Sequence, residues 1–297
     1  MRHWIYTPKQ SGPPPVIAFF ISGSGTNYQQ IVAANPHNRY VVFTNRPGCE
    51  GARNATAAGH TVIELSHHDY LEGAREKYGL NKVPRNCPER TEYEKRVSGL
   101  LEEACGGEPD LICLAGYDQW VTDWLVERYY PRILNVHPGD TIKGYDGLHW
   151  LPSAKAIIAG DPAVKSTLFL VDKGEDTGPV LLQSKPLGIR ATLKNLKKRG
   201  EGGLVDQLES LQAFIQSSGI TSYRDFSALA SAEQKSQIKL ICQAVQNELK
   251  VQGDWKIYPF AVHELISKGR VEVDGRDIYV DGIKQPETGY SNDCFKL

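Results

Sequence analysis

The stretch Val-Ile-Ala-Phe-Phe-Ile-Ser-Gly-Ser-Gly-Thr-Asn, residues 16 to 27, decides the fold. Its first half, Val16 to Ile21, is a continuous run of apolar, branched and aromatic residues, which is typical of a strand buried in a parallel sheet. Its second half, Ser22 to Asn27, is a glycine-containing turn, and Tyr28 to Ala34 can form the helix that follows. A buried strand, a tight turn and a helix predict the start of an α/β fold.

The same alternation of short apolar runs and longer amphipathic segments continues to about residue 184. We expect further strands at Tyr40–Phe43, His60–Leu65, Asp110–Ala115, Ile133–His137, Ser166–Val171 and Val180–Ser184, and helices at Arg90–Ala104, Trp124–Tyr130 and Ser153–Ala159. Strands that alternate with helices predict a mostly parallel, doubly wound, Rossmann-like sheet. Ligands of such sheets bind beyond the carboxyl ends of the strands.

The composition changes after about Leu187, where a polar and basic segment precedes three further helical patterns. These patterns cover Leu204–Ile215, Phe226–Leu249 and Ile257–Lys268. An apolar stripe at near-helical spacing indicates a helical insertion at about 191–250; it comprises Phe226, Leu229, Ile238, Ile241, Val245 and Leu249. Three roles for this insertion stay open: docking on the parent domain, forming the subunit interface of a homodimer, or capping a substrate site.

The segment Val271 to Val280 alternates apolar and polar residues around Asp274-Gly275, which predicts a small C-terminal β-hairpin. We therefore expect one domain at 16–290, including the insertion, preceded by an N-terminal tail at 1–15.

Composition excludes several classes of protein. A formal net charge of −1 argues against a protein built to bind nucleic acid, and no apolar run approaches the roughly 20 residues that span a bilayer. The first fifteen residues are polar and lack the apolar core of a signal peptide, so we expect a cytoplasmic protein with small-molecule substrates. The six cysteines show no Cys-x-x-Cys spacing and the eight histidines no His-x-x-x-His spacing, so we expect reduced thiols and no metal site.

The turn Ser22 to Asn27 suits an anion, because glycine lets a ligand approach the backbone and the start of a helix offers free amides. The same glycines would also suit close packing of a strand against a helix, so both interpretations stay open. The turn is not the dinucleotide-binding fingerprint, since position 28 is Tyr where that motif has Gly.

Two further segments carry reactive side chains. Asn135 and His137 lie two apart on an extended segment, so they project to the same face, where an amide donor and an imidazole suit stabilising an oxyanion and moving a proton. The alternative is a strand end whose polar residues bond to the backbone. The loop Asp172–Val180 is rich in glycine and acidic residues; a carboxylate there would orient His137 and raise its pKa, unless the loop is an acidic turn exposed to solvent.

Four motifs in order carry a family resemblance: Ser-Gly-x-Gly-Thr-Asn after the first strand, Leu-Ala-Gly-Tyr at 114–117, Asn-Val-His-Pro at 135–138, and Asp-Thr-Gly-Pro-Val at 176–180. Together they resemble the folate-dependent formyltransferases, and among them the phosphoribosylglycinamide formyltransferases of purine synthesis. The similarity runs from about Val16 to Leu187 and resumes around Trp255 to Tyr290.

The resemblance implies transfer of a formyl group from 10-formyltetrahydrofolate, as co-substrate, to the amine of glycinamide ribonucleotide, with no metal. It implies catalytic roles for Asn135, His137 and Asp176. It implies that a further set of residues contacts the folate, namely Arg90 near it and Tyr117, Asp118, Gln119, Trp120 and Val121 along the pterin pocket. It implies that Gly25, Thr26 and Asn27 hold the phosphate and ribose of the acceptor, with Asp254 as an acidic contact.

Two departures leave the acceptor open. The loop Gly139 to His149 replaces the Ser-Leu-Leu-Pro of the glycinamide enzymes, and the short bacterial enzymes have no counterpart of the insertion. The alternatives are a formyltetrahydrofolate hydrolase, made less expected by the short N-terminal segment, and a formyltransferase for a nucleotide sugar or for transfer RNA. Neutral charge and the lack of a basic C-terminal domain count against transfer RNA. A non-catalytic phosphate-binding protein on this fold is a further alternative, which the intact triad makes less expected.

Overall fold

The computed structural model describes residues 1–8, 12–79, 82–198 and 203–290. The chain divides into two compact units. Unit 1 comprises Met1–Val136, Phe169–Leu181 and Tyr258–Gly289, and unit 2 comprises His137–Leu168 and Leu182–Ile257 together with Tyr290. The first boundary falls inside a strand, between Val136 and His137.

A seven-stranded sheet carries the α/β fold, with the strand order β4-β3-β2-β5-β6-β8-β9. Its first five strands pair in parallel. The strands are β2 (Val16–Ile21), β3 (Arg39–Thr44), β4 (Thr61–Glu64), β5 (Leu111–Leu114), β6 (Ile133–His137), β8 (Thr167–Leu170) and β9 (Val180–Gln183). Every strand expected from the alternating pattern is present, and the predicted fold class is confirmed.

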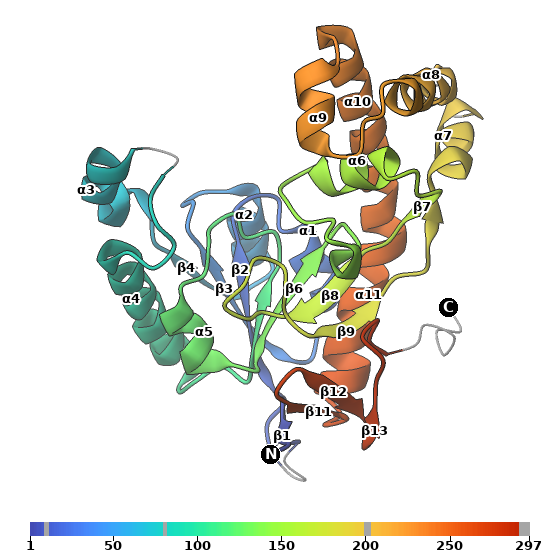
Figure 1. The fold of residues 1–297 in the computed structure, drawn as a ribbon. Helices are drawn as coiled ribbons and strands as arrows, with labels where there is room; N and C mark the ends of the chain where they lie inside the picture. Colours follow the sequence, from blue (N-terminus) through green and yellow to red (C-terminus); the bar gives the residue numbers. More distant parts are fainter. Residues whose placement is uncertain (9–11, 80–81, 199–202, 291–297) are drawn as a thin grey trace. The chain divides into compact units, whose positions relative to one another are not determined.

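Helices cover both faces of β2, whose residues alternate between two apolar environments (Figure 1). Phe20 belongs to a buried cluster with Leu101 of α4 and Leu125 of α5, whereas the ring of Phe19 lies 5.1 Å from that of Tyr28 in α1. The remaining elements of this group are α1 (Thr26–Ala34), α2 (Glu50–Ala57), α3 (His68–Tyr78), α4 (Pro88–Cys105), α5 (Asp123–Tyr129), α11 (Trp255–Phe260) and the π-helix η3 (Ala261–Ile266). A strand buried on both faces explains the continuous apolar run at 16–21.

The insertion forms a helical cluster within unit 2 (Figure 1). Its helices are α7 (Ile189–Lys198), α8 (Leu204–Ser217), α9 (Tyr223–Leu229) and α10 (Ala232–Leu249). Their buried side chains share one core with Ala154 and Ile157 of α6 (Leu151–Ile158), a helix of the predicted parent domain. The insertion therefore packs on α6.

The predicted single helix at 226–249 is wrong, because the chain breaks between α9 and α10. Ser231 begins α10 with a capping box: its hydroxyl accepts from the Gln234 amide at 3.2 Å, and the Gln234 side chain accepts from the Ser231 amide at 2.8 Å. This Ser-x-x-Gln pattern is a recognised helix start. Leu229 at the end of α9 is 61% exposed and does not belong to the buried stripe in which it was expected.

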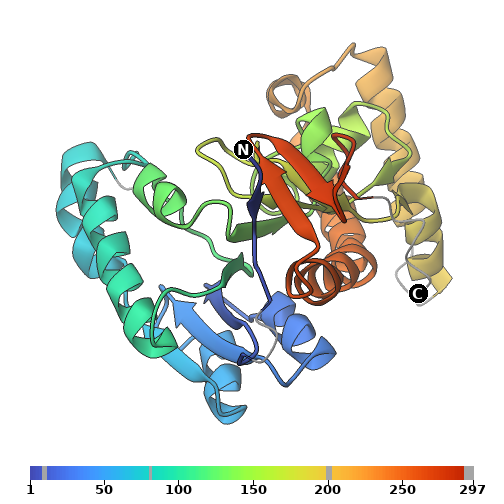
Figure 2. The same cartoon turned by 90° about the horizontal axis from the view of Figure 1, so that it is seen from below.

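The C-terminal hairpin is confirmed as part of a larger antiparallel sheet, with the order β1-β11-β12-β13. Figure 2 shows β1 (His3–Trp4), from the stretch expected as a tail, beside β11 (Val271–Asp274), with which it pairs. Asp274 pairs with Asp277 of β12 (Asp277–Val280), so the turn is Gly275-Arg276, one residue later than expected. The last strand is β13 (Ile283–Lys284).

Three short elements complete unit 2: the two-stranded ladder of β7 (Ala163–Val164) and β10 (Leu187–Gly188), the 3-10 helix η1 (Thr141–Lys143), and the π-helix η2 (Lys250–Asp254). Within the residues that the structure describes, no helix is both long and apolar enough to cross a membrane.

Phe226 and Leu229 on α9 give a matched test of the insertion's packing. We expect Phe226→Ala to lower the free energy of unfolding by about 3–5 kcal/mol, because it removes a fully buried ring and leaves a cavity. Leu229→Ala on the exposed side should change it by less than about 0.5 kcal/mol. Urea denaturation of both variants measures the difference, and equal losses would contradict this orientation of α9.

Candidate functional site

The turn between β2 and α1 has the geometry of an anion site. Gly25 is the N-cap residue of α1, with φ of +65°, and no side chain caps this helix. The free amides of the first turn are the groups that bind anions at helix starts. The Oδ1 atom of the buried Asn27, 8% exposed, has no hydrogen-bond partner within the described structure. A buried acceptor without a donor is costly, and a ligand that donates to this atom would remove that cost.

A close backbone approach holds this turn in place. The amide of Gly51 in α2 donates to the carbonyl of Gly23 at 2.9 Å, and a Cβ atom on Gly51 would lie 2.7 Å from Ile21 and 2.9 Å from that carbonyl. Position 51 therefore requires glycine. Sequence analysis missed both α2 and this contact, because a helix whose buried residues are glycine and alanine produces little hydrophobic periodicity.

Hydrogen bonds join the turn to the segment Tyr117–Val121 at the carboxyl end of β5. The hydroxyl of Ser22 donates to Asn45 at 2.6 Å and accepts from the Asp118 amide at 2.9 Å. The Asn45 side chain donates to the Asp118 carboxylate at 3.0 Å, and Arg46 forms an ion pair with it. Burial raises the pKa of Asp118, but hydrogen bonds from Gln119, Asn45 and Ser22 and the charge of Arg46 outweigh it and hold the pKa below its usual value.

The predicted pterin-lining residues lie in different surroundings. Tyr117 packs on Phe20, with ring centroids 5.3 Å apart, whereas Trp120 is 44% exposed and Val121 is buried. Gln119 donates to both the backbone carbonyl and the carboxylate of Asp118. The start of the segment is therefore held by Tyr117 and Asp118, whereas the ring of Trp120 further along is exposed.

Arg90 lies in the first turn of α4 and is half-buried. Its Nε atom has no hydrogen-bond partner within the described structure, and burial lowers the pKa of its guanidinium. A half-buried arginine nitrogen without a hydrogen-bond acceptor suits an acidic group of a ligand. This observation supports the binding role expected for Arg90.

Glu94, one helical turn after Arg90 on α4, binds the residue that follows the segment Tyr117–Val121. Its carboxylate, 3% exposed, accepts from the Thr122 amide at 2.9 and 3.1 Å and from the Thr122 hydroxyl. Thr122 in turn caps α5. Burial raises the pKa of Glu94 to about 7, although the bonds from Thr122 and the charges of Arg90 and Arg85 act in the opposite direction.

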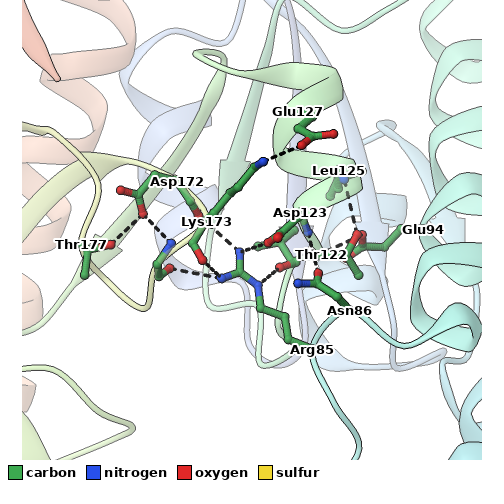
Figure 3. Close-up of polar contacts among 12 residues, drawn as sticks. Arg85, Asn86, Glu94, Thr122, Asp123, Leu125, Glu127, Asp172, Lys173 and Thr177 are labelled. Carbon is green, nitrogen blue, oxygen red and sulfur yellow. Dashed lines mark hydrogen bonds and ion pairs between the residues drawn. The ribbon is translucent and has the colours of Figure 1, made fainter. Parts of the chain in front are cut away.

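The loop that carries Asp176 follows β8 and has a constrained backbone. Asp176 has φ of +51°, in the left-handed region that non-glycine residues seldom adopt. The Asp172 carboxylate accepts from the Gly174 amide at 2.9 Å and from the Thr177 hydroxyl at 2.8 Å (Figure 3). A Cβ atom on Gly178 would lie 1.6 Å from the Leu170 carbonyl oxygen. This positive φ at an expected catalytic residue is the kind of strain found at functional sites.

Arg85 connects this loop to the segment that lines the predicted pterin pocket (Figure 3). Its guanidinium donates to the Val121 carbonyl at 2.6 Å and to the carbonyls of Asp172 and Lys173. Sequence analysis missed Arg85, since nothing in its local pattern marks it. It also missed Asn45 and Arg46, although they directly follow a parallel strand, where ligand-facing residues are expected.

Asn135 and His137 lie on β6 as expected. Tyr258, fully buried in unit 1, donates to the carbonyls of Leu114 and Leu134 at 3.3 and 3.1 Å, which fixes the strand ends next to Asn135. In unit 2 His137 is 5% exposed, and its Nε2 atom donates to the Tyr145 carbonyl at 2.8 Å. A bond at one ring nitrogen fixes the orientation and tautomer of an imidazole.

The loop 139–149, which departs from the family pattern, supplies that carbonyl. A Cβ atom on Gly139 would lie 2.4 Å from the Tyr145 carbonyl and 3.0 Å from the ring of His137, so only glycine allows this approach. Thr167 donates to the Gly139 carbonyl at 2.7 Å, and Gln183 donates to Asp140 at 2.8 Å. The loop also borders a pocket of about 200 Å³ in unit 2, whose polar lining includes Asp140, Lys143, Tyr145, Asp161 and Lys165.

Asp254, the expected acidic contact, ends the π-helix η2 in unit 2 and is 5% exposed. Short π-helical turns are frequent at functional sites. Of the other predicted site residues, His137 lies in unit 2 and all the rest in unit 1. Within the described part of the chain, no group of three or more His, Cys, Asp or Glu residues is arranged to hold a metal ion.

Residues 16–202 match the sequence model of the formyl transferase family. This match covers more than half of the chain, which therefore belongs to the formyl transferase family. The enzyme class expected from the ordered motifs is confirmed.

Individual relatives are more distant. The phosphoribosylglycinamide formyltransferase of Escherichia coli is 30% identical over 177 residues, which are 57% of this chain and 71% of that protein. The Haemophilus influenzae enzyme of the same name is 23% identical over 283 residues, 93% and 99% of the two chains. The trifunctional purine biosynthetic protein adenosine-3 of Drosophila melanogaster is 27% identical over 74% of this chain, but the match spans only 15% of that longer protein.

Two solved structures share the fold. A phosphoribosylglycinamide formyltransferase from Coxiella burnetii aligns with a TM-score of 0.60 at 19% identity, over 93% of this chain and 98% of that one. Glycinamide ribonucleotide transformylase 1 from Symbiobacterium toebii aligns with a TM-score of 0.58 at 23% identity, over 91% and 95%.

The buried carboxyl of Glu94 predicts a pH dependence of stability. Its pKa rises from 4.5 to about 7 on folding, so the folded state binds more protons between these values and loses stability as the pH rises through this window. We expect Glu94→Gln, which cannot ionise, to gain up to about 3 kcal/mol relative to the parent between pH 4.5 and pH 8. Urea denaturation of the parent and of Glu94→Gln at several pH values measures the difference in their free energies of unfolding. A difference that does not change with pH would contradict the raised pKa of Glu94.

Proposed function

We propose that this member of the formyl transferase family moves a formyl group from 10-formyltetrahydrofolate to the amine of glycinamide ribonucleotide. The observation that carries the proposal is the hydrogen-bonded frame in unit 1. Through Ser22 and Arg85 it joins the anion-suited turn at Ser22–Asn27, the segment Tyr117–Val121 and the loop of Asp176. The names of the relatives from Escherichia coli and Haemophilus influenzae support the choice of acceptor.

The roles of the three reactive groups follow from their chemistry. As the acceptor amine attacks the formyl carbon, negative charge develops on the formyl oxygen, and donors aimed at that oxygen lower the barrier. Asn135 and a protonated His137, two apart on β6, supply these donors in the proposal. In the proposal, the carboxylate of Asp176 accepts the proton that the amine releases, directly or through water.

The acceptor's phosphate and ribose are assigned to the start of α1. The uncapped amides there suit the phosphate, and the unpartnered Asn27 Oδ1 suits a hydroxyl donor on the ribose. The unpartnered Arg90 Nε is assigned to an acidic group of the folate. Asp254 is assigned to the acceptor, where a carboxylate favours a positively charged or donating group.

Incubation with 10-formyltetrahydrofolate and one candidate acceptor at a time tests the proposal. Glycinamide ribonucleotide, an amino-sugar nucleotide and water alone distinguish the three enzyme activities. Release of tetrahydrofolate with equal amounts of formylated glycinamide ribonucleotide supports the proposal. Release of formate without an acceptor would indicate a hydrolase. Preferential formylation of the amino-sugar nucleotide would show that glycinamide ribonucleotide is not the acceptor.

We expect His137→Ala and Asp176→Asn each to lower kcat by at least about a hundredfold, the usual scale for the loss of an acid–base group. Asparagine tolerates the positive φ at position 176, so this change removes the charge and retains the loop conformation. Glu175→Gln, an equal loss of charge on the adjacent residue, serves as the control and should retain most activity. Near-normal turnover by a folded His137 or Asp176 variant would remove that residue from the mechanism.

We expect Asn27→Ala to raise the KM for the phosphorylated acceptor by about tenfold, the cost of one hydrogen bond to a buried group. The KM for the folate, measured in the same experiment, should change by less than about twofold and is the internal control. A defect confined to the folate would overturn the assignment of this turn to the acceptor.

A further inference from the structure

We propose that Arg85 is a positioning residue, which fixes the loop of Asp176 against the segment Trp120–Val121 and so sets the place of the catalytic carboxylate. The inference rests on the proposed function, because it gives Arg85 a task in the same reaction. Arg85 itself contacts no reacting atom in this proposal; it acts through the backbone of the loop.

The contacts of Arg85 reach both segments at once (Figure 3). On one side, Nε donates to the Val121 carbonyl at 2.6 Å, and the guanidinium lies 5.9 Å from the centre of the Trp120 ring. On the other side, Nη1 donates to the Lys173 carbonyl and Nη2 to the Asp172 carbonyl at 3.3 Å. The side chain is only 18% exposed, so these bonds are partly shielded from water.

The geometry requires arginine. Three nitrogens of one planar group serve four backbone carbonyls, three of which are more than 80 residues from Arg85 in sequence. Lysine has a single nitrogen and cannot match this fork. The nearest carboxylate is that of Asp123 at 3.7 Å, so the guanidinium acts chiefly as a set of aimed donors.

The loop needs such an external support. Asp176 holds a left-handed backbone, which is uncommon for residues other than glycine, so contacts from the surroundings help to keep it in place. The close approach of Gly178 to Leu170 fixes the end of the loop, and Arg85 fixes its beginning at Asp172 and Lys173. With both ends fixed, Asp176 has little freedom to move away from its place.

Arg276 also contacts this loop but on a different side. From the β11–β12 turn it donates to the Asp172 carboxylate at 2.9 Å and to the Thr177 carbonyl, and its side chain is 66% exposed. Within the part of the chain that the structure describes, these bonds join the loop to the β11–β12 turn, whereas those of Arg85 join it to Trp120 and Val121.

Arg85→Met removes the donors and retains much of the side-chain bulk. We expect kcat for formyl transfer to fall by about 10- to 100-fold, the scale for a small misplacement of a catalytic group. The KM for the phosphorylated acceptor should stay within about twofold, because the turn at Gly25–Asn27 is not touched. Arg85→Lys should restore little of the loss, since the fork and not the charge is required.

Lys173→Ala is the matched control. Lys173 lies on the same loop. Its exposed side chain forms an ion pair with Glu127, and its carbonyl would still accept from Arg85 in the variant. This variant should keep the parent kcat. Full activity in Arg85→Lys, or equal losses in Arg85→Met and Lys173→Ala, would overturn the proposal.

Amide hydrogen exchange separates this inference from the proposed function, because it needs no substrate. Exchange at residues 172–178 should be faster in Arg85→Met than in the parent, and unchanged in Lys173→Ala. Unchanged exchange in Arg85→Met would overturn the positioning role even if the enzyme forms formylated glycinamide ribonucleotide. If the parent transfers formyl to no amine, the proposed function fails while the exchange result still decides whether Arg85 holds the loop. Arg85→Gln, which retains one donor, replaces Arg85→Met if the latter does not fold.

Discussion

Burial of β2 on both faces is the constraint on which the rest of unit 1 depends. Each backbone group of a strand in that position must pair with a neighbouring strand, and β3 and β5 provide those partners in parallel register. The three strands therefore end at the same edge of the sheet. Ser22 and Asn45 directly follow β2 and β3, Asp118 lies four residues after β5, and these three residues bond to one another. The turn at 22–27 and the segment 117–121 thus take their relative position from the pairing of one apolar strand with its two neighbours.

The sequence predicts β2 and β6 to the residue, because β2 is an uninterrupted apolar run before a glycine turn and β6 is a short, mainly apolar segment that ends before Pro138 and Gly139. It does not predict α2, whose buried face consists of Gly51, Ala52 and Ala55 and so lacks a hydrophobic stripe. The break before α10 was predictable, since Ser231 and Gln234 form a local capping signature. The role of Arg85 was not predictable from the sequence, because its hydrogen-bond acceptors are backbone carbonyls 36 to 89 residues away. Any residue type can supply a carbonyl.

The loop after His137 illustrates how a departure from a family pattern can preserve the chemistry of a site. Gly139 lets the chain fold back until the Tyr145 carbonyl reaches the imidazole, and the ion pair of Lys143 with Asp161 at 2.7 Å holds the returning segment. The imidazole is thus oriented by a backbone group. Several side chains of this loop bond to the rest of unit 2, as Asp140 does to Gln183 and Tyr145 does to Asp161.

The proposed catalytic groups are held in two physically different ways. Asn135 takes its place from strand register, which the sheet and the bonds of Tyr258 to neighbouring carbonyls determine. Asp176 lies on a loop outside the named strands, and its left-handed conformation is uncommon for residues other than glycine. A loop residue can be as well positioned as a strand residue only if side chains from elsewhere bond to its backbone. Arginine suits that task because one planar group can join several carbonyls from separate segments. The site therefore depends on a residue outside every family motif, and such residues are found by following the backbone acceptors of a catalytic loop to their donors.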